Sequence, residues 1–499
     1  MINQFDEDMD PGLILAAEEC PPEDFSKFHK FSAHDELIIR KLMAHGPVLI
    51  RGGRGSGKSA LLIEAQLRMR KAGNVLPVYV SLRHLPLLQS EGEEYITHFC
   101  KNLSRSIRDE LSEEKVRFSF PIVGDQTTLQ ENLLQVSQDL NRRIVLLFDD
   151  AAHIGREKPL EGFFDLFRTI SSSLVSCKAS IYPGVTRFGT RFDVYNDSTV
   201  LEVSRSDVSK ESGFFLDVLQ ARYSPLAAAD RFSGGLSPAK FASIIGRAVV
   251  GNMRGFILAC NRFDNTAKIG IPELNTCILE MATDYYWPLM DEVAPKLGVY
   301  EPLIDPARAM MESIVDHAVK LRDRRAAQDR VLIHRQFIAH YAKIFEILEY
   351  LGFLSRREAS RAMKSGGRGS VFAINLCNLL EMIPGQRLTA EGLEEWISGA
   401  IELAEIHVSG NLFAGIEMPT IEDDDRALSI LEKGISNLSK SPAYPYGLTA
   451  DKISRLRDAG YETVGQLAEA SDYNLRQIPM VGPVTLQRVR DVVRQAIWM

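Results

Sequence analysis

This 499-residue sequence lacks long apolar runs, paired cysteines and an excess of positive charge. No apolar run approaches the roughly 18 residues that a membrane-spanning helix needs, so we expect no membrane anchor. The six cysteines are scattered and include no C-x-x-C pair, which argues against a zinc site and a disulfide framework and fits a reducing compartment. The acidic N-terminus has no apolar stretch of the kind a signal peptide carries, and we therefore expect a cytoplasmic protein.

Basic residues are outnumbered by acidic ones. The chain has 58 Lys and Arg against 66 Asp and Glu, a net charge of −8. Such a chain is no polycation, so any surface that binds nucleic acid must be local. A content of 45% hydrophobic and 25% charged residues is typical of globular proteins. The length predicts two to four domains.

A glycine-rich stretch near residue 55 carries the strongest chemical signal in the sequence. Val48 to Ile50 predicts a short strand before it, and Ala60 to Ala65 predicts the start of a helix after it. Glycines leave backbone N–H groups free to face a phosphate, and the helix presents its positive end to the same anion. We expect Lys58 to reach the β- and γ-phosphates of ATP and the Ser59 hydroxyl to ligate Mg²⁺. The stretch fits G-x-x-x-x-G-K-[ST] at every fixed position, and its nucleotide-binding residues are Gly52, Gly53, Arg54, Gly55, Ser56, Gly57, Lys58 and Ser59.

Two carboxylates follow a second apolar run, Ile144 to Phe148. A continuous apolar run is typical of a strand in a buried parallel sheet, and Asp149 and Asp150 come directly after it. In phosphate-loop NTPases a carboxylate at such a strand end holds Mg²⁺. We assign Asp149 to the metal, through water or Ser59, and Asp150 to polarising the attacking water. A solvated aspartate pair in a turn would explain these residues alone, but explains them poorly beside a phosphate loop.

Strands and helices alternate through residues 31–205. Further strands are expected at 75–82, 179–187 and 199–203, and helices at 34–45 (with Ser32 as its cap), 93–112, 127–140 and 160–174. Such alternation predicts a parallel sheet with helices on both faces. Thr186, at the end of the fourth strand, is a catalytic candidate because its hydroxyl is expected near the γ-phosphate.

Residues 30–262 resemble the AAA+ superfamily and, within it, the origin-recognition and STAND-like branch. Besides the phosphate loop, the matching pieces are Leu146 to His153, Gly184 to Arg187 in the sensor 1 place, and a helical lid with Gly251-Asn252-Met253-Arg254. The resemblance implies ATP hydrolysis and makes Arg254 the sensor 2 candidate that contacts nucleotide.

The chain departs from this family at two positions. Asp150 stands where the family usually has glutamate and is one methylene shorter, so hydrolysis is expected to be slow. Met253 replaces the usual proline. The arginine finger stays open between Arg187 and Arg191, and an ordinary surface arginine explains each as well.

A helix followed by a β-hairpin makes residues 328–385 resemble a winged helix, the domain that follows the ATPase in origin-binding relatives. His334 to Leu351 reads as an apolar-periodic helix or helix pair, and Phe353 to Met363 and Val371 to Leu376 read as two strands. Residues 319–368 hold 12 basic and 5 acidic residues, a local charge of +7. A solvated hairpin on a protein-binding domain is the alternative. The side chains expected to contact DNA phosphates are Arg356, Arg357, Arg361, Lys364 and Arg368.

The last fifty residues resemble the helix-hairpin-helix elements in the C-terminal domain of the α subunit of RNA polymerase. Leu456 to Leu467 and Ile478 to Pro483 carry this resemblance. In that fold hairpin N–H groups face a backbone phosphate, which explains the need for Gly482. Helix-hairpin-helix pairs serve protein docking nearly as often, so both roles stay open.

The predicted architecture is an α/β parallel-sheet AAA+ core with a helical lid, followed by a winged helix and a small all-α helix-hairpin-helix domain. Its expected parts are an N-terminal extension (1–30), the ATPase core (31–205), the lid (206–262), a helical connector (263–327), the winged-helix-like domain (328–385), a helical segment with an acidic linker (386–444) and the C-terminal domain (445–499).

The function expected from these parts is that of an ATP- and Mg²⁺-dependent switch associated with DNA through non-specific phosphate contacts. Self-association or an effector protein is expected in the ATP state, and replication, transposition or anti-phage defence would each fit. One alternative is a STAND-type signalling NTPase whose C-terminal domains bind protein and not DNA. Another is a structural adaptor with a degenerate nucleotide site.

Overall fold

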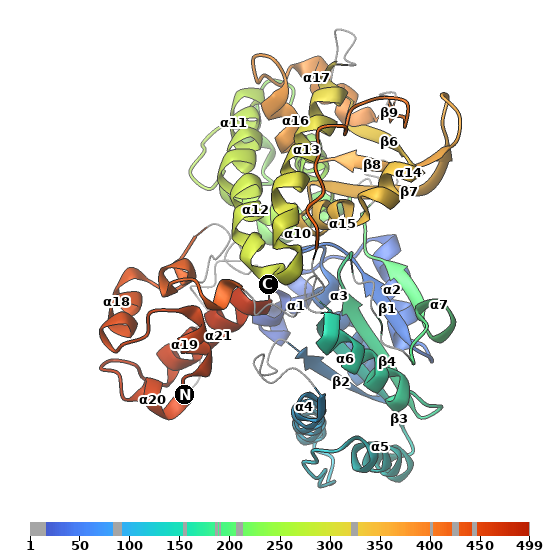
Figure 1. Cartoon of the computed structure of the whole chain (residues 1–499), viewed down its shortest axis with the longest axis vertical. Helices are drawn as coiled ribbons and strands as arrows, with labels where there is room; N and C mark the ends of the chain where they lie inside the picture. Colours follow the sequence, from blue (N-terminus) through green and yellow to red (C-terminus); the bar gives the residue numbers. More distant parts are fainter. Residues whose placement is uncertain are drawn as a thin grey trace.

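The structure is a computed structural model of the whole chain (Figure 1). It describes residues 16–82, 92–152, 157–184, 188, 191–205, 213–320, 328–399, 403–421, 429–441 and 447–498. Across these ranges no helix combines the length and the apolar character that crossing a bilayer requires.

Five parallel strands form the sheet of the N-terminal core, in the order β2-β3-β4-β1-β5. The strands are β1 Val48–Arg51, β2 Val75–Ser81, β3 Arg143–Ala152, β4 Val175–Ile181 and β5 Thr199–Glu202. The helices around them are α1 Pro22–Phe28, α2 Ala33–Met43, α3 Lys58–Ala72, α4 Gly92–Glu113, α5 Gln126–Leu140, α6 Glu157–Ile170 and α7 Val194–Asp197. Because all five strands are parallel, the loop after β1 and the end of β3 leave the sheet at the same edge.

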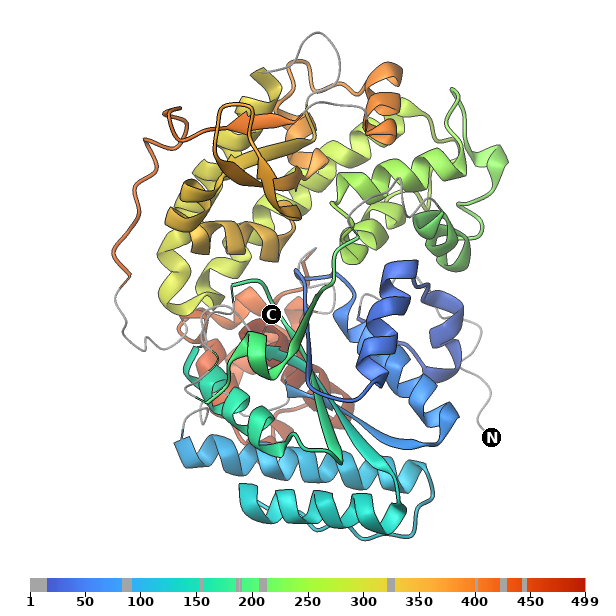
Figure 2. The same cartoon turned by 90° about the vertical axis from the view of Figure 1, so that its right-hand side faces the viewer.

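Helices cover both faces of this sheet because its strands are apolar on both sides. Ile50 and Leu147 pack against α2 and α3, whereas Leu146 and Phe148 pack against α4, α5 and α6. The alternation along β3 is the period of two that a pleated strand imposes. Figure 2 shows α4 and α5 on the opposite side of the sheet from α2 and α3. The predicted α/β core is confirmed, and so is Ser32 as the cap of α2.

The fourth strand differs from its predicted position. It was expected at 179–187, but β4 ends at Ile181, before Pro183 and Gly184. Gly184 has a φ of 88°, and a proline beside a left-handed glycine ends regular pairing. Thr186, the predicted catalytic hydroxyl, lies outside the described residues.

The lid and the connector are helical. Their helices are α8 Phe214–Arg222, α9 Pro238–Ala248, α10 Met253–Asn261, α11 Ile271–Met281, α12 Trp287–Val293 and α13 Ile304–Lys320. A π-helical turn, Ala282–Tyr286, separates α11 from α12 just before Trp287 and Pro288. Pro288 has no N–H to donate, so the regular hydrogen-bond ladder is broken there.

A second sheet contains the β-hairpin. Its order is β7-β8-β6-β9, with β6 Arg330–His334, β7 Leu354–Ala362, β8 Arg368–Ile374 and β9 Ala404–Ile406. The predicted helix from His334 onward is a pair, and the helices of this region are α14 Arg335–His340, α15 Ala342–Leu351, α16 Leu376–Met382 and α17 Ala390–Ser398. Buried side chains from the lid, the connector and this sheet form one continuous apolar core. These three parts therefore fold against one another.

The C-terminal helices form a separate body, at the left of Figure 1. They are α18 Ala450–Asp458, α19 Val464–Glu469, α20 Asp472–Arg476 and α21 Pro483–Trp498. Their small core also includes Ile435 and Leu438, so the unit begins upstream of the predicted boundary at 445.

Candidate nucleotide-binding site

The loop between β1 and α3 has the backbone that its glycines predict. Gly55 and Gly57 have φ angles of 77° and 94°, in the left-handed region that glycine adopts without strain. A Cβ on Gly55 would lie 2.5 Å from the Asn252 side chain. Lys58 is the first residue of α3, so its side chain and the positive end of the helix lie together.

Lys58 is buried within its own loop. Its ammonium donates to the carbonyls of Gly52, at 2.8 Å, and Gly53, at 3.1 Å, and lies 3.7 Å from the centre of the Tyr182 ring. Burial lowers the pKa of Lys58 to about 8, while the nearby carboxylates of Asp150 and Asp149 act in the opposite direction. This ammonium is therefore held in the loop, close to both predicted carboxylates.

Asp149 is fully buried at the end of β3. It accepts hydrogen bonds from the hydroxyls of Ser180 and Tyr79, both at 2.6 Å, and from the Asp150 N–H at 2.9 Å. Burial, followed by the charge of Asp150, raises its pKa, and a hydrogen bond with Ser59 opposes the rise. The predicted metal residues Asp149 and Ser59 are thus brought together.

Asp150 faces the cavity above the phosphate loop. Its φ of 51° is left-handed, a conformation that aspartate tolerates better than most residues. The Tyr182 hydroxyl donates to its carboxylate at 3.1 Å. Asp150 shares the cavity wall with Lys58, Ser59 and Arg254. The carboxylate after β3 and the phosphate-loop residues, which the sequence predicts to act together, therefore line one cavity.

The lid segment Gly251–Arg254 contacts the phosphate loop directly. Asn252 caps α10 through the Gly255 N–H and donates from its side-chain amide to the Arg54 carbonyl. The N–H groups of Met253 and Arg254 donate to the Gly55 carbonyl at 3.0 and 3.3 Å. A proline at position 253 would have no N–H for this bond, which gives the departure from the family pattern a physical reason.

Arg254 lines the cavity from the lid. Burial and the neighbouring Arg54 lower the pKa of its guanidinium. A cationic side chain that lines a cavity together with Lys58 suits a polyanionic ligand. Its predicted role as a contact for nucleotide stays a prediction.

Arg205 is a site residue that was missed from the sequence. It is buried, forms an ion pair with Asp35 at 3.2 Å and donates to the Ser56 carbonyl of the loop. Asp35 also belongs to the capping box of α2. The capping box could have pointed to Arg205, because it holds the buried carboxylate of Asp35, and a buried carboxylate needs a cation as its partner.

An apolar part of the cavity wall was missed from the sequence. It comes from the end of α1, the segment that follows it and the lid, regions far apart in the chain. The Arg222 side chain of α8 donates to the Phe28 carbonyl at 3.2 Å and joins these regions. Aromatic and aliphatic walls suit a flat base. The lining residues include Phe28, Phe31, Val218, Met253 and Ile257.

Two of the five basic residues predicted to contact DNA are engaged within the protein. Arg357 donates to the carbonyls of Arg205, at 2.9 Å, and Val250, at 3.3 Å. Arg356 forms an ion pair with Glu349 at 3.1 Å and lies over the Phe372 ring. Arg357 thus bonds the hairpin both to Arg205 of the core and to Val250 of the lid.

The other three predicted contacts are exposed on the hairpin. Arg361 pairs with Glu358, and Arg368 donates to the Ser360 hydroxyl at 2.7 Å. The Lys364 N–H donates to Glu405 at 3.0 Å. The local excess of positive charge is thus partly offset by carboxylates.

In the C-terminal body, a Cβ at Gly482 would meet no atom within 4 Å, so this hairpin turn is open to its surroundings.

The comparisons with known proteins found similar solved structures. No family model matches the sequence, and a search of curated proteins found no match. Similar solved structures include Cdc6p from Pyrobaculum aerophilum, with 13% identity over 75% of this chain and 97% of that chain and a TM-score of 0.33.

Two structures from Aeropyrum pernix extend this likeness. The ORC1 protein, solved in complex with DNA, has 15% identity over 78% of this chain and 96% of that chain, with a TM-score of 0.32. The ORC2 protein has 12% identity over 75% of this chain and 96% of that chain, with a TM-score of 0.36. At these values the likeness concerns the fold, and residue roles follow from this chain's own geometry.

Proposed function

We propose that this chain is a Mg²⁺-dependent ATPase that acts as a nucleotide-controlled switch. The observation that carries the proposal is the shared cavity. It is lined by Lys58 and Ser59 from the loop, Asp150 from β3 and Arg254 from the lid. Cations from the loop and the lid and a carboxylate from β3 suit a nucleoside triphosphate and its metal.

The residues present fit a magnesium ion. The Ser59 hydroxyl and the carboxylates of Asp149 and Asp150 are hard oxygen donors, which Mg²⁺ prefers. When bound, the ion would offset charge on the phosphates. Asp149 is oriented by Ser180 and Tyr79, so it offers a preformed donor.

The remaining residues have separable roles. Lys58 would exchange its bonds to the carbonyls of Gly52 and Gly53 for phosphate oxygens. Asp150 would orient the attacking water and accept its proton. Because its side chain is one methylene shorter than glutamate, we expect slow turnover.

The partners follow from the surfaces outside the cavity. We propose that the exposed hairpin residues Arg361, Lys364 and Arg368 contact DNA phosphates. The backbone at Gly482 would make a further phosphate contact. The ATP state would favour self-association or an effector protein, in a replication, transposition or defence setting.

A STAND-type signalling NTPase is the second candidate. The ion pair of Arg356 with Glu349 and the bond of Arg357 to the core favour it, because these side chains are used within the protein. In this case nucleotide state would be passed through the hairpin to a protein partner.

Phosphate release by the full chain tests the proposal. Wild type should release phosphate from ATP only with Mg²⁺, and Lys58→Ala should lose at least about 100-fold in rate, because the loop ammonium stabilises developing charge. A matched control, Lys71→Ala, changes an exposed lysine at the far end of the same helix and should leave the rate unchanged. If wild type binds ATP without turnover, the adaptor with a degenerate site is correct instead. Equal rates in wild type and Lys58→Ala would refute the site.

A further inference from the structure

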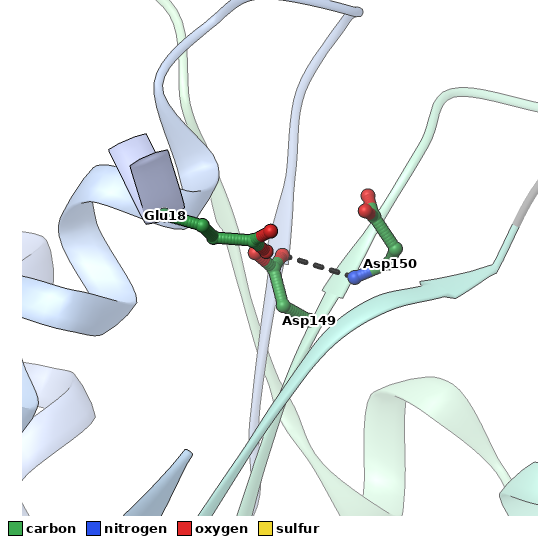
Figure 3. Close-up of side chains that lie close together, drawn as sticks. All are labelled: Glu18, Asp149 and Asp150. Carbon is green, nitrogen blue, oxygen red and sulfur yellow. Dashed lines mark hydrogen bonds between the residues drawn. The ribbon is translucent and has the colours of Figure 1, made fainter. Parts of the chain in front are cut away.

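A third carboxylate reaches the two aspartates from outside the sheet. Glu18 lies in a short 3-10 turn, Ala17–Glu19, that precedes α1. Oxygen atoms of Glu18, Asp149 and Asp150 all lie within 4.8 Å of one another (Figure 3). Glu18 also lines the cavity that contains Lys58 and Ser59. No sequence motif pointed to it, since it stands 131 positions before Asp149.

The position of Glu18 is fixed by apolar packing on the phosphate-loop helix. Cys20 and Phe25 are buried, and Ala17 packs with them against the α3 residues Ala60 and Ile63. This face of α3 begins one residue after Ser59. The segment that carries Glu18 is therefore held against the helix that carries the phosphate-binding residues.

Tyr79 shares its hydroxyl between two of these carboxylates. Its oxygen lies 2.5 Å from Glu18 and 2.6 Å from Asp149. A phenol has one proton to donate, so it satisfies one of these two acceptors at a time. Three carboxylates this close together repel one another, and a cation among them relieves this repulsion.

The conformation of Asp150 explains why a carboxylate from elsewhere is useful here. A left-handed φ at this position favours aspartate over the longer glutamate. The shortened side chain lies where the resemblance implies a glutamate. Glu18 brings the longer side chain to the same place from the N-terminal segment.

We propose that Glu18 is a further ligand, directly or through water, of the Mg²⁺ that the proposed function requires. Together with Ser59 and Asp149 it would complete an oxygen donor set around the phosphates. The inference rests on the proposed function, because it presupposes that nucleotide and metal bind in this cavity.

The test measures metal-dependent nucleotide binding rather than turnover. A fluorescent ATP analogue is titrated into the full chain in EDTA and again in Mg²⁺. Glu18→Gln should reduce the gain in affinity that Mg²⁺ brings by about tenfold, and leave affinity in EDTA equal or improved. Glu19→Gln, a change at the neighbouring exposed residue, is the matched control and should behave as wild type.

Thermal unfolding in EDTA separates a metal ligand from a structural residue. Removing one of three like charges should leave the Glu18→Gln melting temperature equal to that of wild type or raise it. A lower melting temperature, or an unchanged Mg²⁺ effect on affinity, would overturn the role of Glu18. If wild type itself fails to bind the analogue, the proposed function fails instead, so the two failures are distinguishable.

Discussion

The phosphate loop and the β-hairpin are both rich in charge, but they use it in different ways. Around the loop, Lys58, Asp150 and Arg254 face one cavity. On the hairpin, Arg357 bonds two carbonyls of the protein and Arg361 pairs with a carboxylate three residues away. The spacing of a motif fixes a local backbone and hence where side chains point, whereas a count of basic residues leaves their direction open.

The two aspartates offer the sharpest test of the cavity side. Asp150→Asn should keep ATP bound and lower turnover by about 100-fold, because it removes the group that orients water. Asp149→Asn should instead weaken binding that depends on Mg²⁺. Binding and phosphate-release assays on both variants measure the difference. Identical behaviour of the two variants would contradict the separate roles.

The free energy of unfolding of an Arg357 variant tests whether the hairpin arginine stabilises the protein. Arg357→Ala should lower the free energy of unfolding by about 2 kcal/mol, because it removes a charged donor from two carbonyls. Arg361→Ala removes an exposed ion pair and should cost no more than about 0.5 kcal/mol. Urea denaturation measures both. If both variants lose the same free energy of unfolding, Arg357 contributes no more to stability than the exposed Arg361.

Salt dependence of DNA binding gives the smallest expected effect. Replacing Arg361, Lys364 and Arg368 together should make the slope of log K against log salt shallower by about 2 to 3. The loss should be similar on two unrelated duplexes, because phosphate contacts carry no sequence information. Arg357→Ala should leave the slope unchanged. Matching slopes in wild type and the triple variant would favour the signalling alternative.

The features that depend on local geometry could be predicted from the sequence. The phosphate loop, the apolar run of β3 and the two aspartates after it could be predicted because each lies in a continuous segment. Glu18 and the apolar cavity wall could not, because they reach the site through packing between segments far apart in the chain. The shared core of the lid, connector and second sheet was missed for the same reason.

The hairpin illustrates a second limit. Its strands followed from composition and turn residues, and β7 and β8 form there. The partner of Arg357 is a pair of backbone carbonyls, and carbonyls have no sequence signature. A basic side chain that bonds them cannot be told from a DNA contact before the fold is known.

Calorimetric titration of the full chain with ATP and Mg²⁺ tests the central claim most directly. The cavity predicts one ATP bound per chain, with affinity about 100-fold weaker in Lys58→Ala, whose loss removes the loop ammonium from the phosphates. Binding of equal strength and stoichiometry in wild type and Lys58→Ala would contradict the assignment of this cavity as the nucleotide site.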